Sequence, residues 1–319
     1  MNHEQEIATL EAQVPVTAGV TGAEATAPGG ARLWQTANAF IALTKPRVLT
    51  LVIFSGLPAL VMAAGAWPGA GFVFSVLLGI AIAAGAANAL NCYVERDLDA
   101  LMERTASRPL PSAVLTPRAA LYFGLLLSVL STALLYAVGG TLAALLGVAS
   151  ILFYVFVYTV WLKPRSTWNA VVGGAAGAAA PLIADAAVTG AVGMPGLILF
   201  SIIFFWQPPH VWAIALYRKD DYRAAGIPML PNVIGDQPTR WRMLWYTVGL
   251  LPVTMAPLPL GLLGWIYGAP ALLLGLWFTW HAVRVLREQD DAAARRMFHV
   301  SLLYLFALFI AMLIDLALA

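Results

Sequence analysis

Long apolar runs recur along almost the whole chain, and they restrict its possible folds more than any other feature of the sequence. The runs are about 18 to 22 residues long, the length that an α-helix needs to cross the apolar core of a bilayer. The mean hydropathy of +0.81 excludes a soluble globular domain. Nine candidate spans result, near residues 43–65, 71–91, 118–138, 141–161, 169–190, 195–216, 243–263, 267–286 and 298–318.

We therefore expect an all-α fold, a polytopic membrane protein in which about nine transmembrane helices form one bundle around a central cavity. Most spans contain Gly and Ala, which allow helices to approach closely in lipid. Proline predicts interruptions, because it removes a backbone donor and clashes with the preceding helical turn. Kinks or breaks are therefore expected in the fifth span, which contains Pro181, and in the seventh, which contains Pro252, Pro257 and Pro259.

Basic residues are confined to one side of this arrangement. All 18 Lys and Arg residues lie in the N-terminal segment, in the loops after spans two, four, six and eight, or at the adjoining helix ends. The opposite loops, near 66–70, 139–140, 191–194 and 264–266, contain none. The positive-inside rule makes the basic side cytoplasmic, with the N-terminus inside and the C-terminus outside. The net charge of +2 hides this asymmetry, and we expect the lipid bilayer and no nucleic acid as a partner.

The N-terminal segment, residues 1–38, differs from the rest of the chain. It has no basic start and no apolar run, so it is not a secretory signal. Its composition, rich in Ala, Thr, Gly and Pro, predicts a disordered cytosolic tail before a transmembrane domain over residues 39–319. The single cysteine, Cys92, excludes an internal disulfide, and the Cys and His clusters that bind zinc are absent.

The first charged stretch, residues 91–111, places seven charged residues between apolar runs in a chain that is only 11% charged. If it begins as a helix, Asn91, Glu95 and Asp99 share one face at positions i, i+4 and i+8 and span about 12 Å. Such oxygen ligands suit Mg²⁺, which leaves its other positions to water and phosphate oxygens. Two bases that could hold phosphate follow, Arg104 and Arg108.

The second charged stretch, residues 206–236, follows the sixth span on the same side of the membrane. It repeats the combination of acids for metal and bases for phosphate, with Arg218, Lys219, Asp220, Asp221 and Arg223. Two such loops facing one pocket could hold Mg²⁺ ions around a diphosphate. The alternative is a pair of solvated loops that only fix orientation. Orientation needs bases alone, so the interleaved acids favour a site.

Several further residues allow more than one interpretation. Lys45 and Arg47, at the entry to the first span, could anchor the helix or contact diphosphate. His210, directly after Pro208 and Pro209, could be a structural residue, a ligand or a catalytic base. The tryptophans beside it, Trp206 and Trp212, could offer a flat apolar surface to a porphyrin.

The remaining charges are interpreted as features of the membrane boundary. Lys163 and Arg165, together with the basic residues between 284 and 296, are expected to be anchors. Asp185 is expected to be interfacial, and Asp315 is expected to reach the opposite surface by snorkelling.

These residues resemble the UbiA superfamily of intramembrane prenyltransferases. Its first acidic motif, Asn-Asp-x-x-Asp-x-x-x-Asp, corresponds to Asn91, Cys92, Glu95 and Asp99. Cys92 and Glu95 depart from the motif; Glu can still bind a metal, but its longer arm shifts the ion by about a methylene.

Three strings resemble one branch of the superfamily more narrowly, the protohaem IX farnesyltransferases. They are LTKPRV at 43–48, NCY-x-x-RD-x-D-x-x-M-x-RT-x-x-RPL from Asn91, and FFWQPPHVWAIALYRKDDYRAAGIPMLP at 204–231. With the nine spans, the resemblance covers about residues 38–319. Three long, separated motifs make it specific, whereas one alone would indicate only the superfamily.

The resemblance implies transfer of farnesyl from farnesyl diphosphate to a vinyl group of haem B, giving haem O, for haem A synthesis and terminal oxidases. It implies Mg²⁺ as cofactor, with haem B as a substrate. It also implies a multi-pass protein of the bacterial inner membrane, with cytoplasmic active-site loops and contact with a haem A synthase or terminal-oxidase assembly factors.

The resemblance also assigns roles to residues. His210 would lie near the haem, as axial ligand or as the base for water. The metal ligands would be Asn91, Glu95, Asp99, Asp220 and Asp221. The catalytic set would be Asn91, Glu95, Asp99, His210 and Asp221. The diphosphate contacts would be Lys45, Arg47, Arg104, Arg108, Arg218 and Lys219.

Two other functions remain open at this point. A UbiA enzyme with another acceptor, such as an aromatic quinone precursor or chlorophyllide, would carry a similar metal motif. A transporter would also use broken helices and buried charge, but it would place charges within its spans and show two-sided symmetry. This chain keeps nearly all its charge at one face, which favours an enzyme with a single entrance.

Overall fold

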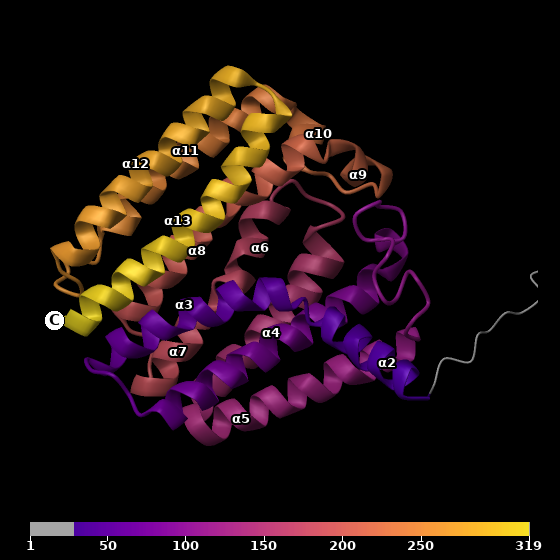
Figure 1. The fold of residues 1–319 in the computed structure, drawn as a ribbon, viewed down its shortest axis with the longest axis horizontal. Helices are drawn as coiled ribbons and strands as arrows, with labels where there is room; N and C mark the ends of the chain where they lie inside the picture. The colour runs from indigo at the N-terminus through magenta and orange to yellow at the C-terminus, as the bar shows by residue number, and fades with distance from the viewer. Residues whose placement is uncertain (1–28, 319) are drawn as a thin grey trace, which may run out of the picture. The chain divides into compact units, whose positions relative to one another are not determined.

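The computed structural model describes residues 29–318, and in that range the chain is helical and contains no strand (Figure 1). By its internal contacts the chain divides into residues 1–35 and a compact unit of residues 36–319. Helix α2 (Gly29–Leu43) begins earlier than expected, since residues 29–38 were predicted to belong to the disordered tail. The rest of that prediction concerns residues 1–28, which lie outside the described residues.

The compact unit consists of long helices joined by short connections. α3 (Pro46–Ala64) and α4 (Ala70–Asp99) are followed by α5 (Pro117–Leu152), which continues as the π-helix η2 (Phe153–Leu162). Then come α6 (Asn169–Gly177), α7 (Ala179–Thr189) and α8 (Met194–Tyr217). Two short helices, α9 (Lys219–Ala224) and α10 (Leu230–Ile234), precede α11 (Asp236–Met255), α12 (Trp265–Glu288) and α13 (Asp291–Leu318).

Seven helical segments in the described range are long and apolar enough to cross a membrane. One of them, residues 117–162, has 46 residues and would be about 69 Å long if straight, more than twice the bilayer core. Gly140 interrupts it with a φ of 77°, which glycine adopts at little cost. A Cβ on Gly147 would lie 2.7 Å from Leu135 Cδ1, so the two arms fold back on each other as the expected third and fourth spans.

Helix α11 occupies the place of the remaining expected span, but it is not among these seven segments, because Asp236, Arg240 and Arg242 lower its hydropathy. The prediction of about nine helices therefore agrees with the structure. Of the expected interruptions, the fifth span is divided into α6 and α7 at Ala178, three residues before Pro181. In the seventh span Pro252 lies inside α11 without ending it, and the helix ends at Met255, before Pro257.

One end of the helical unit carries all Lys and Arg residues from position 45 onward. At this end α4, η2, α8 and α12 terminate, and α3, α5, α6, α11 and α13 begin. In Figure 1 this basic end lies at the upper right, away from the C-terminus. The one-sided distribution that the sequence predicted is therefore a property of the folded chain.

The two acids at the opposite end are buried, which corrects both expectations for them. Asp185 accepts hydrogen bonds from two backbone N–H groups at the start of α8, Gly193 at 2.7 Å and Gly196 at 3.0 Å. Asp315 accepts two at the start of α12, at 2.7 and 3.0 Å. Helix N-termini have unsatisfied N–H groups and a positive dipole end, so a carboxylate there is stabilised without water.

Candidate functional site

The last turns of α4 carry three oxygen-bearing side chains on one face, as the spacing predicted. Asn91, Glu95 and Asp99 are all buried within the bundle, at 1%, 3% and 1% exposure. The helix continues from its apolar half straight into this polar segment and ends at Asp99. Buried charge of this kind requires a partner, because an isolated carboxylate loses several kcal/mol of hydration.

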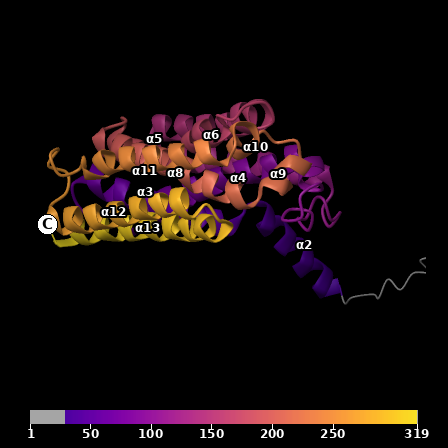
Figure 2. The ribbon, with the colours of Figure 1, turned by 90° about the horizontal axis from the view of Figure 1, so that it is seen from above.

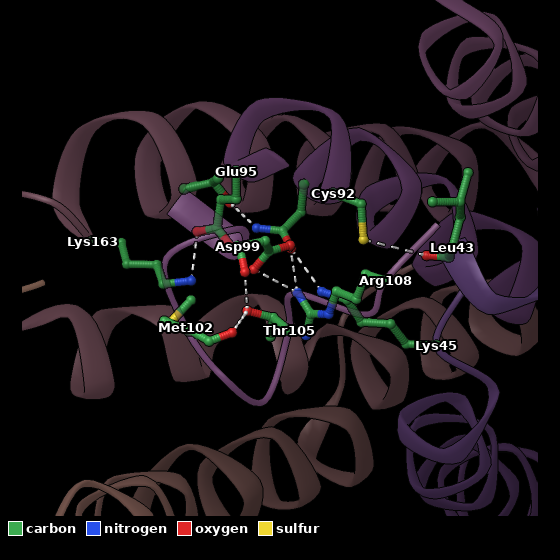
Figure 3. Close-up of polar contacts among 11 residues, drawn as sticks. Leu43, Lys45, Cys92, Glu95, Asp99, Met102, Thr105, Arg108 and Lys163 are labelled. Atoms are coloured by element: carbon green, nitrogen blue, oxygen red, sulfur yellow. Dashed lines mark hydrogen bonds and ion pairs between the residues drawn. The ribbon is translucent and has the colours of Figure 1, made fainter. Parts of the chain in front are cut away.

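A base faces each member of this row (Figure 3). Arg108 Nη1 donates to both oxygens of Asp99, at 2.8 and 2.7 Å, and Lys163 Nζ donates to Glu95 Oε1. Lys45 Nζ donates to Asn91 Oδ1 at 2.7 Å. The three bases come from different parts of the chain: the segment before α3, the end of η2 and the loop between α4 and α5. We call these six residues the acid–base cluster: Asn91, Glu95, Asp99, Lys45, Arg108 and Lys163.

Lys45 reaches the cluster through an unusual backbone conformation. It adopts a left-handed conformation, with φ 54° and ψ 64°, directly before Pro46. A non-glycine residue in this region is strained by about 1 to 3 kcal/mol, and such strain concentrates at functional sites. Burial lowers the pKa of the Lys45 ammonium, and nearby Cys92 acts in the opposite direction. Lys45 thus binds Asn91 inside the bundle, whereas Arg47 is exposed, and a diphosphate contact of either residue stays a prediction.

Lys163 is a member of the cluster that the sequence pattern did not reveal, since it was expected to be an anchor. It follows the π-helix η2, whose wider turn is seen in the bond from Lys163 N to Tyr158 O at 2.8 Å. Burial acts to lower the pKa of Lys163, but Tyr158 and Glu95 outweigh it and the pKa is raised. A basic residue at a helix end is also what anchoring predicts, so the sequence contained no signal that distinguished the two.

The two adjacent acids of the second charged stretch point in different directions. Asp220 is 94% exposed and pairs with Arg223 at 2.8 Å, so the structure does not bring it to the other acids. Asp221 is largely buried, and its Oδ2 has no hydrogen-bond partner among the described residues. The nearest base is Arg218, whose Nη1 lies 3.7 Å away. Lys219 pairs with Asp236 at 2.8 Å instead of with these acids.

The two charged stretches lie against each other at the basic end. Met102, from the loop after α4, packs with Ala225, Ile227 and Met229 from the segment between α9 and α10. Figures 1 and 2 show this loop and α9 together in both views. Tyr222 is also near enough to Lys163 to affect its pKa. The prediction that the two stretches face one another is therefore confirmed.

The donor atoms fit a hard divalent cation, although they do not form a closed cage. Within residues 29–318 no three His, Cys, Asp or Glu side chains converge on one point. The row on α4 nevertheless offers amide and carboxylate oxygens, the ligands that Mg²⁺ prefers. Asp221 Oδ2 is buried and accepts no hydrogen bond, with Arg218 Nη1 3.7 Å away, so it is a polar atom that a cation would satisfy. Arg104 is exposed, and its contact with diphosphate stays a prediction.

His210 lies on α8, among aromatic rings. Its ring stacks on Trp206, with centroids 4.5 Å apart, and lies 4.9 Å from the ring of Phe298. Its Nδ1 is 2.6 Å from Ser301 Oγ of α13. The expectation that two tryptophans offer a flat surface to a porphyrin is wrong, because both are buried: Trp206 covers His210, and Trp212 packs edge-on against Tyr246.

Comparison with known proteins gives consistent matches over most of the chain. The family model described as the UbiA prenyltransferase family matches residues 52–312. The protoheme IX farnesyltransferase of Acidiphilium cryptum is 48% identical over 293 residues, which cover 89% of this chain and 92% of that protein. The protoheme IX farnesyltransferase of Rhodopseudomonas palustris strain BisB5 is 47% identical over 280 residues, 86% of this chain and 89% of that one.

Solved structures with low sequence identity share the fold. A structure described as digeranylgeranylglyceryl phosphate synthase superposes with a TM-score of 0.75 at 17% identity, over 89% of this chain and 99% of that one. A UbiA homologue from Archaeoglobus fulgidus bound to GPP and Mg²⁺ gives a TM-score of 0.60 at 16% identity. The superposition covers 86% of this chain and 99% of that one. At these identities the superpositions support the fold and not the substrate.

Proposed function

The chain belongs to the UbiA prenyltransferase family, and from this we propose that it is an enzyme that transfers a farnesyl group from farnesyl diphosphate to the vinyl group of haem B. The products are haem O and diphosphate. Curated relatives named protoheme IX farnesyltransferase, 47 to 48% identical over most of both chains, support this acceptor over a quinone precursor. Confinement of the basic residues to one end supports an enzyme over a transporter.

The observation that carries the proposal is the acid–base cluster, in which buried Asn91, Glu95 and Asp99 each bind a base. Breaking the C1–O bond of farnesyl diphosphate leaves both bonding electrons, and hence negative charge, on the diphosphate. Preorganised positive groups lower the barrier most when they lie where this charge develops. Lys45, Lys163 and Arg108 are three such groups within one small region. Asp99 holds Arg108, Glu95 holds Lys163, and the amide oxygen of Asn91 holds Lys45.

A divalent cation would be held by Asn91, Glu95 and Asp99, together with Asp221. When bound, it supplies charge neutralisation to the diphosphate leaving group. Asp220 is not part of this proposed set, because its side chain is exposed and paired with Arg223. The Archaeoglobus fulgidus homologue bound to GPP and Mg²⁺ supports the class of cation.

The remaining steps concern the haem and water. The π electrons of the vinyl group form the new bond to farnesyl C1, and water then captures the resulting cation on the haem side chain. One proton must leave that water, and His210 is the proposed base or, alternatively, the ligand of the haem iron. The allylic group requires a dry environment, because bulk water would trap it, and the apolar bundle is the proposed source of that environment.

The location and partners of the chain follow from its spans and its proposed product. The chain is a multi-pass membrane protein, which we place in a bacterial inner membrane with the N-terminus and both charged stretches in the cytoplasm and the C-terminus outside. Because its product is a membrane-bound haem, a haem A synthase or an oxidase assembly factor is the proposed neighbour.

Mass spectrometry of the products tests the function. Membranes containing the chain receive haem B, farnesyl diphosphate and Mg²⁺, and parallel samples receive an aromatic quinone precursor in place of haem. We expect a product with the mass of haem O in the first sample alone. Prenylation of the quinone precursor without haem O would contradict the proposed acceptor, and uptake of labelled substrate into vesicles without any product would favour a transporter.

A further inference from the structure

Ser301 on α13 connects Trp206 and His210, two stacked rings of α8. Its side chain is fully buried. Its backbone oxygen accepts a hydrogen bond from Trp206 Nε1 at 2.8 Å. Its Oγ lies 2.6 Å from His210 Nδ1 and 2.6 Å from the backbone oxygen of Phe298.

Counting protons in this group determines the direction of the hydrogen bonds. A serine hydroxyl has one proton, and a backbone carbonyl has none. The contact between Ser301 Oγ and Phe298 O is a hydrogen bond only if the serine donates. Ser301 Oγ must then accept from His210, which places the histidine proton on Nδ1. The other ring nitrogen, Nε2, keeps its lone pair, and it makes no hydrogen bond to any described residue.

The surroundings of the ring favour one orientation. Trp206 and Phe298 lie against His210, with ring centroids within 5 Å. A flip of the imidazole would bring a carbon atom to Ser301 and lose a buried hydrogen bond, which costs about 1 to 3 kcal/mol. The ring is therefore held both by stacking and by the serine.

We propose that Ser301 is a positioning residue that holds His210 in the Nδ1–H tautomer, so that the Nε2 lone pair is free to accept a proton or to bind iron. The assignment of a haem reaction to His210 rests on the proposed function, but the tautomer does not. Both roles considered for His210 need an unprotonated Nε2. Hydrogen bonds to the distant nitrogen of a functional histidine are known to set its tautomer and to affect activity about 10- to 100-fold.

Nitrogen NMR tests the tautomer directly. The full chain is labelled with ¹⁵N-histidine and placed in lipid bilayers at neutral pH, and the His210 signals are identified by their loss in His210→Ala. We expect a protonated Nδ1 and an unprotonated Nε2, with Ser301→Thr retaining this pattern and Ser301→Ala changing it. A protonated Nε2 in the unmodified chain would overturn the proposal, and so would an unchanged pattern in Ser301→Ala.

Kinetics with a matched control test the functional consequence. Ser301→Ala should lower kcat for haem O formation about 10- to 100-fold with little change in KM for farnesyl diphosphate, and should add nothing to His210→Ala. Ser55, on α3, is the control: it is buried, and it also donates to a carbonyl three residues earlier, Val52 O, at 2.7 Å. Equal decreases of kcat in Ser55→Ala and Ser301→Ala would overturn the positioning role of Ser301. If no variant or parent forms haem O, the proposed function fails, whereas the NMR result still decides the tautomer.

Discussion

Single carboxylates at the end of α4 are matched with single bases, and this matching explains how the chain tolerates charge inside an apolar bundle. Asp99 receives both of its hydrogen bonds from one arginine, and Glu95 receives one from a lysine. The row on α4 could be predicted from its spacing of four residues. Its partners could not, because Lys45 and Lys163 are separated from it by tens of residues and only the fold brings them together.

The pairing of Lys163 with Glu95 leads to a prediction for stability. Lys163→Met removes one partner of a buried pair and leaves a carboxylate without compensation, which should cost about 3 to 5 kcal/mol. The double variant Lys163→Met with Glu95→Gln removes both charges and should recover much of the lost stability. Thermal unfolding of the purified protein in detergent measures this. A double variant no more stable than Lys163→Met would contradict a direct pair.

Glu95→Asp examines the departure of this chain from the superfamily motif. Aspartate keeps the charge and restores the residue that the motif carries, so turnover should remain close to that of the parent. The assay is haem O formation across a range of Mg²⁺ concentrations. A loss as large as that of Glu95→Gln would show that the longer arm, and not only the charge, is required.

Among the elements, helix ends show what sequence patterns can and cannot reveal. Apolar runs located the spans, and the prolines located the interruption between α6 and α7 to within three residues. The π-helical geometry of η2 could not be predicted, since its sequence FYVFVYTVWL is equally compatible with an α-helix. The caps on α8 and α12 were missed because their acids lie far along the chain or in another span, where local pattern gives no information.

The cap formed by Asp185 gives a prediction that separates stability from catalysis. Asp185→Ala leaves two N–H groups at the start of α8 without an acceptor, that of Gly196 buried and that of Gly193 partly buried, which should destabilise the protein by about 2 kcal/mol. Asp185→Asn keeps one acceptor oxygen and should therefore lose less stability than Asp185→Ala. Unfolding temperature measures the loss, while turnover per folded molecule should stay unchanged because the cap lies at the end opposite the cluster. An unchanged unfolding temperature in Asp185→Ala would contradict the capping role.

For the molecule as a whole, the separation of charge between the two ends is the main organising feature. The basic end carries the acid–base cluster and both charged stretches, and the other end carries the two capping acids. This separation was predictable from the sequence, because the order of the spans alone tells which loops share an end and which of them contain Lys and Arg. The expected central cavity stays a prediction, since side-chain packing and not the hydropathy pattern determines it.

Orientation in the membrane can be tested by labelling. Cysteines introduced as Ser107→Cys and Arg223→Cys lie at the basic end, and Ala191→Cys lies at the other. We expect an impermeant thiol reagent added to intact cells to reach position 191 but neither of the others. Native Cys92 is buried and should not react. Labelling of position 107 or 223 from outside would reverse the proposed topology.

The central claim is that the acid–base cluster is the place where the diphosphate leaves, and Asp99 tests it most directly. Asp99→Asn is nearly isosteric and removes a charge that faces Arg108. Asp97→Asn is the matched control: Asp97 is two residues away on the same helix, but its side chain is 83% exposed. The measurement is the rate of haem O formation by each purified variant in bilayers, with folding checked by unfolding temperature. The account predicts that Asp99→Asn loses turnover by at least about 100-fold, as for removal of a principal charge-stabilising group, whereas Asp97→Asn keeps it. Near-parental turnover of a folded Asp99→Asn would contradict the account.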